Sequence, residues 1–242
     1  MLEINHITVR SAKIAQPLTF AVCPDFHNGD VELVLSACRG ADAILIPGDL
    51  VDRHDRRTNG FDNAVRFLKE APDVAPVFYA IGNHERKLKT LADYWPHVAR
   101  SRVTVLDDCF VTFGGIVLGG LSSIRVGKEA HKLPLQLAEK KPFLREMAAQ
   151  PGFKLLMCHH PEYFADAVLN RDIDLTVAGH AHGGQVCIGR QGVYAPGQWL
   201  FPKLTSGFYY DEWIIFVHSV APYRKFVFSV RAHSLTQTQG RN

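Results

Sequence analysis

The sequence predicts an α/β fold with α+β character: a four-layer sandwich of two mixed β-sheets flanked by helices. Short apolar strands alternate with amphipathic helices in the first half of the chain, which is typical of a parallel sheet covered on both faces. Shorter strands around Gly-Gly turns follow, and two further buried strands each end at a histidine. The 242 residues contain no repeat, low-complexity tract or Pro/Gly/Ser linker, so one domain over residues 1–242 is expected.

The first half of the chain predicts a strand–helix–strand–helix–strand order. Apolar runs bounded by proline or glycine indicate buried strands at residues 18–23, 43–46 and 77–81. Apolar residues at helical spacing indicate a helix over residues 30–39, with Asp30 as its N-cap and Gly40 as its stop. The same spacing predicts a second helix over residues 62–70.

The second half changes character and contains more strands than helices. Short strands are predicted at residues 103–106, 110–113 and 116–121, and a helix over residues 142–149. Two buried strands follow at residues 153–158 and 175–178. From Gln191 onward, short apolar runs alternate with proline and glycine, which predicts a second, mostly antiparallel sheet.

Composition limits the class of protein and its surroundings. A hydrophobic content of 47% with 21% charged residues is typical of a globular protein. The net charge of +3 gives no basic field for a long nucleic-acid track. Five cysteines without a CxxC pair argue against a disulfide framework or a thiolate zinc knuckle. The sequence shows no transmembrane segment and no signal peptide, in which a basic region would precede an apolar one. A cytoplasmic location is therefore expected.

Polar side chains follow each of five predicted buried strands. In chain order they are Asp25 and His27, Asp49 and Asp52, Asn83 and His84, His159 and His160, and His180 and His182. Any one pair has an ordinary explanation, such as a local hydrogen bond or a turn. Ligand and catalytic groups gather at the carboxyl ends of parallel strands, so five successive occurrences predict one shared site.

The donor types in this set predict a metal centre. Carboxylate oxygen, neutral imidazole and amide oxygen suit ions such as Mn, Fe or Zn, and the lack of thiolate argues against a purely structural zinc. Two ions need an anionic bridge to offset their repulsion, and Asp49 is the candidate for that bridge.

The motifs together resemble those of the calcineurin-like metallophosphoesterase superfamily. They are Asp-x-His, Gly-Asp-x-x-Asp, Gly-Asn-His-Glu, a strand-final His and Gly-His-x-His, and they extend from Asp25 to Gln185. The run GHAHGGQV further resembles the branch that includes UDP-2,3-diacylglucosamine hydrolases and membrane-associated bacterial phosphoesterases. The resemblance implies two divalent or trivalent metal ions, with Mn favoured over Fe or Zn.

The resemblance also implies a ligand set. One ion would be held by Asp25, His27, Asp49 and His182, and the second by Asp49, Asn83, His159 and His180. Spacing alone does not decide between His159 and His160. The family usually places this ligand two residues before a proline, and Pro161 makes His159 the match.

The remaining roles follow the same resemblance. A hydroxide bridging the two ions would attack phosphorus, with His84 as leaving-group acid or substrate contact and Asp52 orienting it. Arg53 and Arg125 are candidate phosphate contacts, although a solvated surface arginine is the ordinary alternative. The cluster that starts at Glu85 is interpreted as a helix start, with Glu85 near the positive end of the helix dipole.

Three functions are consistent with this reading. The first is hydrolysis of small-molecule phosphate mono-, di- or pyrophosphate esters. The second is a nuclease or cyclic-nucleotide phosphodiesterase on the same metal core. The third is a non-catalytic metal-binding scaffold, which the complete set of ligand types disfavours. The natural substrate and the oligomeric state are not indicated.

Overall fold

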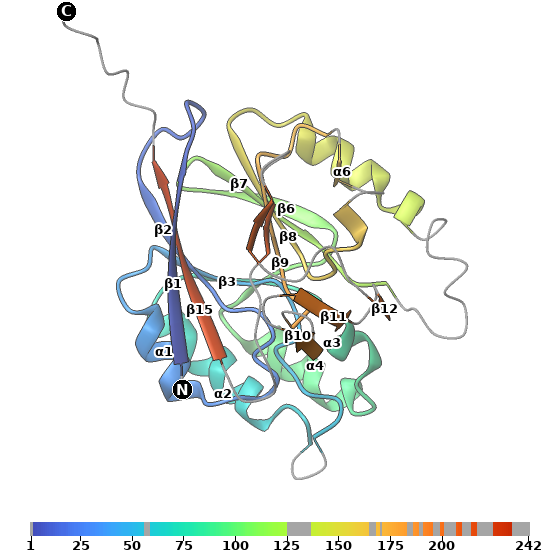
Figure 1. Ribbon diagram of the computed structural model, residues 1–242. Coiled ribbons are helices and arrows are strands. Elements are labelled where there is room, and N and C mark those ends of the chain that lie inside the picture. Colours follow the sequence, from blue (N-terminus) through green and yellow to red (C-terminus); the bar gives the residue numbers. More distant parts are fainter. Residues whose placement is uncertain are drawn as a thin grey trace, which may run out of the picture.

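The computed structural model describes residues 2–55, 59–124, 137–164, 168–169, 171–182 and six later strands between residues 186 and 233. Two six-stranded sheets form its centre (Figure 1). The first sheet contains, in spatial order, β1 (Leu2–Arg10), β15 (Lys225–His233), β2 (Leu18–Val22), β3 (Ala43–Ile46), β4 (Val77–Ala80) and β5 (Thr104–Leu106). The second contains β13 (Gly207–Tyr209), β14 (Ile214–Phe216), β9 (Leu175–Ala178), β8 (Phe153–Cys158), β7 (Ile116–Leu121) and β6 (Cys109–Phe113).

Both sheets are mixed. Strands β2 to β5 are parallel neighbours, whereas β15 is antiparallel to β2 and parallel to β1. In the second sheet β14, β9, β8 and β7 are parallel, and β13 and β6 pair antiparallel at the two edges. A small antiparallel sheet contains β10 (Val186–Ile188), β11 (Gln191–Ala195) and β12 (Trp199–Leu200).

Helices cover the outer faces of both sheets. Those on the first sheet are α1 (Val31–Cys38), α2 (Asp62–Glu70) with the 3-10 turn η1 (Ala71–Asp73), α3 (Asn83–Lys87) and α4 (Leu91–Arg100). Helix α6 (Lys141–Ala148) lies on the second sheet. The predicted four-layer sandwich of two mixed sheets flanked by helices is therefore confirmed. Among the described helices, none has the length and apolarity needed to cross a bilayer.

Side-chain alternation along the strands explains why the central strands are apolar throughout. On β3, Ala43 and Leu45 face the second sheet, while Ile44 and Ile46 face the helices. On β8, Leu155 and Met157 face the first sheet, while Leu156 and Cys158 face α6. A strand with both faces covered buries every side chain, which turns the usual alternating pattern into a continuous apolar run.

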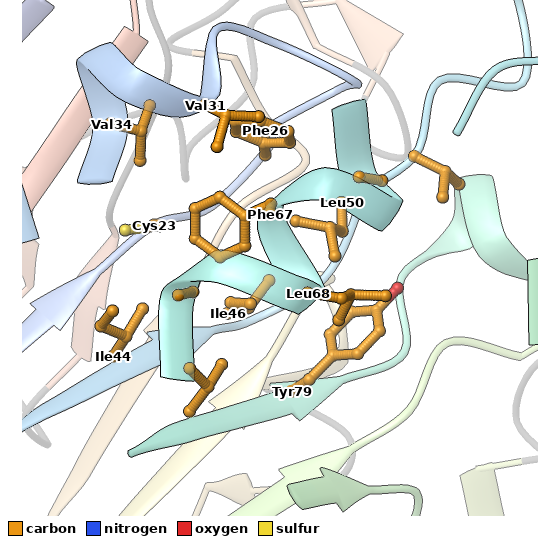
Figure 2. Close-up of a cluster of buried hydrophobic side chains, with 14 of the residues drawn as sticks. Cys23, Phe26, Val31, Val34, Ile44, Ile46, Leu50, Phe67, Leu68 and Tyr79 are labelled. Atoms are coloured by element: carbon orange, nitrogen blue, oxygen red, sulfur yellow. The ribbon is translucent and has the colours of Figure 1, made fainter. Parts of the chain in front are cut away.

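The layer between α2 and the first sheet is a packed aromatic and aliphatic cluster (Figure 2). Phe67 projects from α2 toward Cys23 and Ile46 of the sheet, and its ring centroid lies 5.0 Å from that of Phe26. Phe26 belongs to the loop that carries Asp25 and His27, so this packing also fixes the start of the predicted site.

The predicted helix starts are largely confirmed. The Asp30 side chain accepts a hydrogen bond from the backbone N–H of Leu33 at 3.0 Å, which caps α1 as the sequence indicates. Helix α2 has the predicted bounds, and α6 is displaced by one residue. Helix α4 was not predicted, because it contains Pro96, a residue that normally interrupts a helix.

The prediction for the last fifty residues is only partly right. Strands β10 to β12 form an antiparallel sheet, but β14 extends the second sheet in parallel to β9, and β15 lies inside the first sheet. Strand β1, the partner of β15, was also missed. Its apolar residues change phase between Ile4 and Ile7, so no single alternation runs along it.

Replacing Phe67 with alanine is expected to lower the free energy of unfolding by roughly 3–5 kcal/mol, because the ring is fully buried and leaves a cavity. Urea denaturation followed by circular dichroism would measure the change. The exposed Lys69→Ala variant on the same helix is the control and should stay within about 0.5 kcal/mol of the unmodified protein. Similar losses in both variants would contradict the packing described for α2.

Candidate metal centre

Five loops that follow parallel strands of the two sheets meet at one place. The loops after β2 and β3 run side by side, because the His27 N–H donates to the Asp49 carbonyl at 2.9 Å. The loops after β8 and β9 are joined in the same way, by the Gly179 N–H and the His159 carbonyl at 3.1 Å. The His180 N–H links the two sheets, since it donates to the Asp25 carboxylate at 3.1 Å. The strand ends predicted to share a site therefore do converge.

The loops adopt backbone conformations that side chains normally avoid. Seven described non-glycine residues have a positive φ, and all but Asp108 lie in these loops. The six are Asp25, His27, Asn28, Asp49, His180 and His182, with φ between 45° and 66°. Left-handed backbone is uncommon outside glycine and gathers where a function requires a particular side-chain direction.

Two glycines allow the loops to approach each other. A Cβ on Gly48, where φ is 127°, would lie 2.8 Å from His159 Nδ1 and 2.8 Å from the Gly82 Cα. A Cβ on Gly179 would lie 2.9 Å from an oxygen of Asp25. Both positions therefore require glycine, because any side chain would push a polar group out of the cluster.

The first group of potential ligands is Asp25, His27 and His182. One ligand atom from each lies within 4.8 Å of the others. His27 Nε2 is 3.8 Å from Asp25 Oδ1 and 4.0 Å from Asp49 Oδ2, and the rings of His27 and His182 are stacked with centroids 5.2 Å apart.

The second group is Asp49, His159 and His180, whose ligand atoms also lie within 4.8 Å of one another. His159 Nε2 is 3.1 Å from Asp49 Oδ2 and 3.1 Å from Asn83 Oδ1. Oxygen Oδ2 of Asp49 thus lies near both groups of histidines. A single carboxylate oxygen between two sets of ligands has the arrangement of a shared, bridging donor.

His160 has a different environment from His159. Its Nδ1 lies 2.9 Å from Glu162 Oε1, and its ring centroid is 4.1 Å from that of His180. Glu162 Oε1 is also 3.8 Å from His180 Nε2. The structure therefore brings His159 against Asp49 and Asn83, whereas His160 and Glu162 lie behind His180. Glu162 is within hydrogen-bond distance of His160 and not of His180, so the ring that its carboxylate orients is that of His160.

Burial and charge give this cluster the properties of a cation site. Burial alone would raise the pKa of the Asp49 carboxyl, but His159 and His84 outweigh it and hold that pKa well below its usual range. Burial similarly lowers the pKa of His27 to about 4, despite the two nearby carboxylates. Burial alone would lower the pKa of His159, but Asp49 raises it to about 9, so a cation that binds His159 has to displace a proton from this ring, whereas His27 is readily neutral.

Unpaired polar atoms support the same conclusion. Both ring nitrogens of His27 are buried, and neither has a hydrogen-bond partner among the described residues. Buried polar atoms in folded proteins nearly always have a partner. A cation held between His27 Nε2 and the nearby carboxylates would supply a partner for that nitrogen, so the residues fit a bound metal.

His84 lies at the rim of the cluster with Asp52. Its backbone N–H donates to Asp49 Oδ1 at 2.8 Å, and its Nε2 is 3.8 Å from Asp49 Oδ2. On the other side, Nδ1 accepts a hydrogen bond from the Arg53 N–H at 3.2 Å and lies 3.4 Å from Asp52 Oδ1. The interaction with His84 lowers the pKa of Asp52 to about 2, which keeps this carboxylate ionised.

Glu85 has a structural role that sequence reasoning missed. Its fully buried carboxylate accepts hydrogen bonds from the backbone N–H groups of Leu50 at 2.6 Å, Gly82 at 2.8 Å and Asp49 at 3.1 Å. It was interpreted as a residue near the positive end of a helix. Glu85 is indeed in the first turn of the short helix α3, but it also fastens the loop that carries Asp49 to the end of β4.

The two candidate phosphate-binding arginines differ. Arg53 is half-buried beside His84, and its Nε donates to His54 Nε2 at 3.0 Å. Arg125 lies outside the described residues.

The four cysteines whose side chains are described are free thiols. Cys23 and Cys38 lie in van der Waals contact within the core, with their sulfurs 3.5 Å apart.

The fold and this cluster define a metal-binding α/β sandwich protein, with several His and Asp groups that could hold divalent ions at one edge of its sheets. The family model of the calcineurin-like phosphoesterases matches residues 18–184, more than half of the chain. The chain belongs to the calcineurin-like phosphoesterase family.

Several curated proteins are similar to this chain, and two of those named below are metallophosphoesterases. An uncharacterized metallophosphoesterase of Campylobacter jejuni is 26% identical over 197 residues, which cover 76% of this chain and 49% of the relative. One from Helicobacter pylori strain 26695 is 28% identical over 195 residues, covering 76% of this chain and 50% of the relative. The uncharacterized protein YpbG of Bacillus subtilis is 22% identical over 205 residues, or 80% and 74% of the two chains. The chain spans about half the length of the first two.

Replacing Glu85 with glutamine is expected to destabilise the protein and to lower its metal content. The new amide N–H would face backbone N–H groups in place of an accepting oxygen, a loss of roughly 2–4 kcal/mol in the free energy of unfolding. Urea denaturation and elemental analysis of the purified protein would measure both. The exposed Glu146→Gln variant on α6 is the matched control. Normal stability and metal content in Glu85→Gln would contradict the anchoring role.

Proposed function

We propose that this protein is a dinuclear metal-dependent phosphoesterase that hydrolyses small-molecule phosphate esters with water. The observation that carries the proposal is the position of Asp49 Oδ2, which lies 4.0 Å from His27 Nε2 and 3.1 Å from His159 Nε2. One carboxylate oxygen between two sets of imidazole donors is the arrangement that a pair of nearby cations requires.

The ligand assignment follows the two groups. We propose that one ion is held by Asp25, His27, Asp49 and His182, and the other by Asp49, Asn83, His159 and His180. The family resemblance favours Mn, with Fe or Zn as alternatives, and the mixture of oxygen and imidazole donors suits all three. When bound, two such ions lower the pKa of a water molecule and neutralise charge on the phosphate oxygens.

The protein's own contribution is to hold Asp49 in place. Its backbone N–H is fixed by Glu85, and its Oδ1 accepts the backbone N–H of His84, so Oδ2 remains directed toward the histidines. A carboxylate fixed in this way needs no rearrangement when the ester binds, which is the basis of electrostatic preorganisation.

His84 is the proposed leaving-group acid. Its Nδ1 lies against Asp52 and the Arg53 N–H, and its Nε2 faces Asp49 and the cluster. A proton on that nitrogen can pass to the leaving oxygen of an ester bound there. Burial alone would lower the pKa of His84, but Asp49 and Asp52 raise it above its usual value, which favours the protonated donor.

Arg53 is the proposed phosphate contact, because its backbone N–H binds His84 Nδ1 and its positive charge is near enough to His84 to oppose a rise in the pKa of that ring. Arg125 stays a candidate for the same role. The low net charge favours small esters over a long nucleic-acid strand.

We further propose one domain over residues 1–242 and a cytoplasmic location. The free thiols of the described cysteines are in keeping with that location.

The proposed function predicts that the purified protein contains metal and hydrolyses p-nitrophenyl phosphate or bis(p-nitrophenyl) phosphate. A chelator should abolish the rate, and added Mn should restore it, because the ions activate the water. Elemental analysis should give about two ions per chain at saturation. The monoester and diester arms separate a phosphatase from a phosphodiesterase. A protein that binds no metal, or whose rate is unaffected by the chelator, would rule out the proposal.

Replacing His84 with alanine is expected to lower turnover by roughly 10²- to 10⁴-fold, the usual contribution of a general acid, while most of the metal content is retained. Asp49→Asn should lose both metal and activity, because the shared oxygen loses its charge. The exposed His97→Ala variant on α4 is the matched control. Equal loss of metal and turnover in His84→Ala would show that His84 acts as a ligand rather than an acid.

A further inference from the structure

A pocket of about 670 Å³ is lined by Asp52, whose Oδ1 lies 3.4 Å from His84 Nδ1. Asp52 and Arg53 form one wall, and Lys87 and Lys89 form another. Its volume falls within the range of roughly 300–1,000 Å³ that small-molecule pockets occupy. Asp52, which contacts His84 Nδ1, places the pocket directly next to the proposed leaving-group acid.

The acids in this pocket already have partners. Asp52 accepts a hydrogen bond from the His54 N–H at 2.9 Å and lies 3.4 Å from His84. Asp55 accepts a hydrogen bond from Asn28 Nδ2 at 3.2 Å. The carboxylates of Asp52 and Asp55 therefore interact with the loops of the site and not with the lysines.

The cations, in contrast, are not neutralised. Within the described part of the chain, no carboxylate lies within 4.0 Å of the charged nitrogens of Arg53, Lys87 or Lys89. Burial and then the nearby Arg53 lower the pKa of Lys87, so these two like charges are close enough to repel each other. An anion between them would relieve that repulsion, and arginine and lysine are the side chains that bind phosphate.

We propose that this pocket binds a second phosphate group of the substrate. The inference rests on the proposed function, because the first phosphate is the one at the metal centre. The pocket adjoins His84, the proposed acid for the leaving group, so the second phosphate belongs to the leaving-group part of the molecule. The substrate class is then a phosphate ester whose alcohol or phosphate leaving group carries another phosphate.

The test compares alkanediol monophosphates with the matching bisphosphates, over chains of two to six carbons, using metal-loaded protein. Release of inorganic phosphate gives kcat/KM for each compound. The bisphosphate of matching length should react faster than its monophosphate, and salt should reduce this advantage, because exposed charges are screened. Lys87→Gln should lower kcat/KM for that bisphosphate about fivefold to tenfold more than for the monophosphate, the scale of one charged contact.

Lys89→Gln is a second variant, which should also lower kcat/KM more for the bisphosphate than for the monophosphate. The exposed Lys141→Gln variant on α6 is the matched control and should change neither rate. Equal effects of Lys87→Gln on both compounds, or no advantage of any bisphosphate, would overturn the proposed pocket.

Calorimetric binding of the same compounds distinguishes failure of the pocket from failure of the proposed function. Tighter binding of a bisphosphate that Lys87→Gln removes supports the pocket even where no ester is hydrolysed, and the missing hydrolysis then counts against the phosphoesterase alone. Hydrolysis of monophosphates and bisphosphates with equal binding in all variants supports the phosphoesterase and overturns the pocket.

Discussion

The arrangement of this site depends on how the Asp49 carboxylate is fixed. Oδ1 accepts the His84 N–H, the Asp49 N–H is bound by Glu85, and Oδ2 is left facing the histidines from both sheets. Glu85 itself is buried and requires several backbone donors, which the Gly82 turn and the loop after β3 supply. A buried carboxylate without these donors would be strongly unfavourable, so the loops and the two acids stabilise one another.

The two stacked sheets serve this arrangement by bringing strand ends to one edge. Parallel strands place all their carboxyl ends together, and the shared hydrophobic layer between the sheets holds the two edges in register. Asp25 then reaches across to the His180 N–H, and Asp49 reaches His159. The site therefore lies where the sheets meet, and either sheet alone would carry only half of it.

Much of the fold and the convergence of the site could be predicted because those signals are local. Buried strands appear as short apolar runs, and a polar residue after each run marks a strand end. Glu85 could not be assigned in this way, because its partners Asp49 and Leu50 lie 36 and 35 residues earlier in the chain. Strand β15 was misplaced for the same reason, since its neighbour β1 lies at the opposite end of the sequence. The carboxylate of Glu162, which lies 3.8 Å from His180, likewise comes from a separate loop, the one after β8.

The left-handed backbone of the loop residues links the fold to its ligands. Each such residue costs of the order of 1–3 kcal/mol, and several occur side by side around the acids and histidines. A cation that binds only this conformation adds its binding free energy to that of folding, about 2.7 kcal/mol at a free concentration one hundred times its dissociation constant. Folding of the chain and binding of the metal ion are thus one coupled equilibrium. Protein synthesised while the metal ion is scarce would unfold locally at these loops first. Cellular proteases would therefore degrade it before the metal-bound protein.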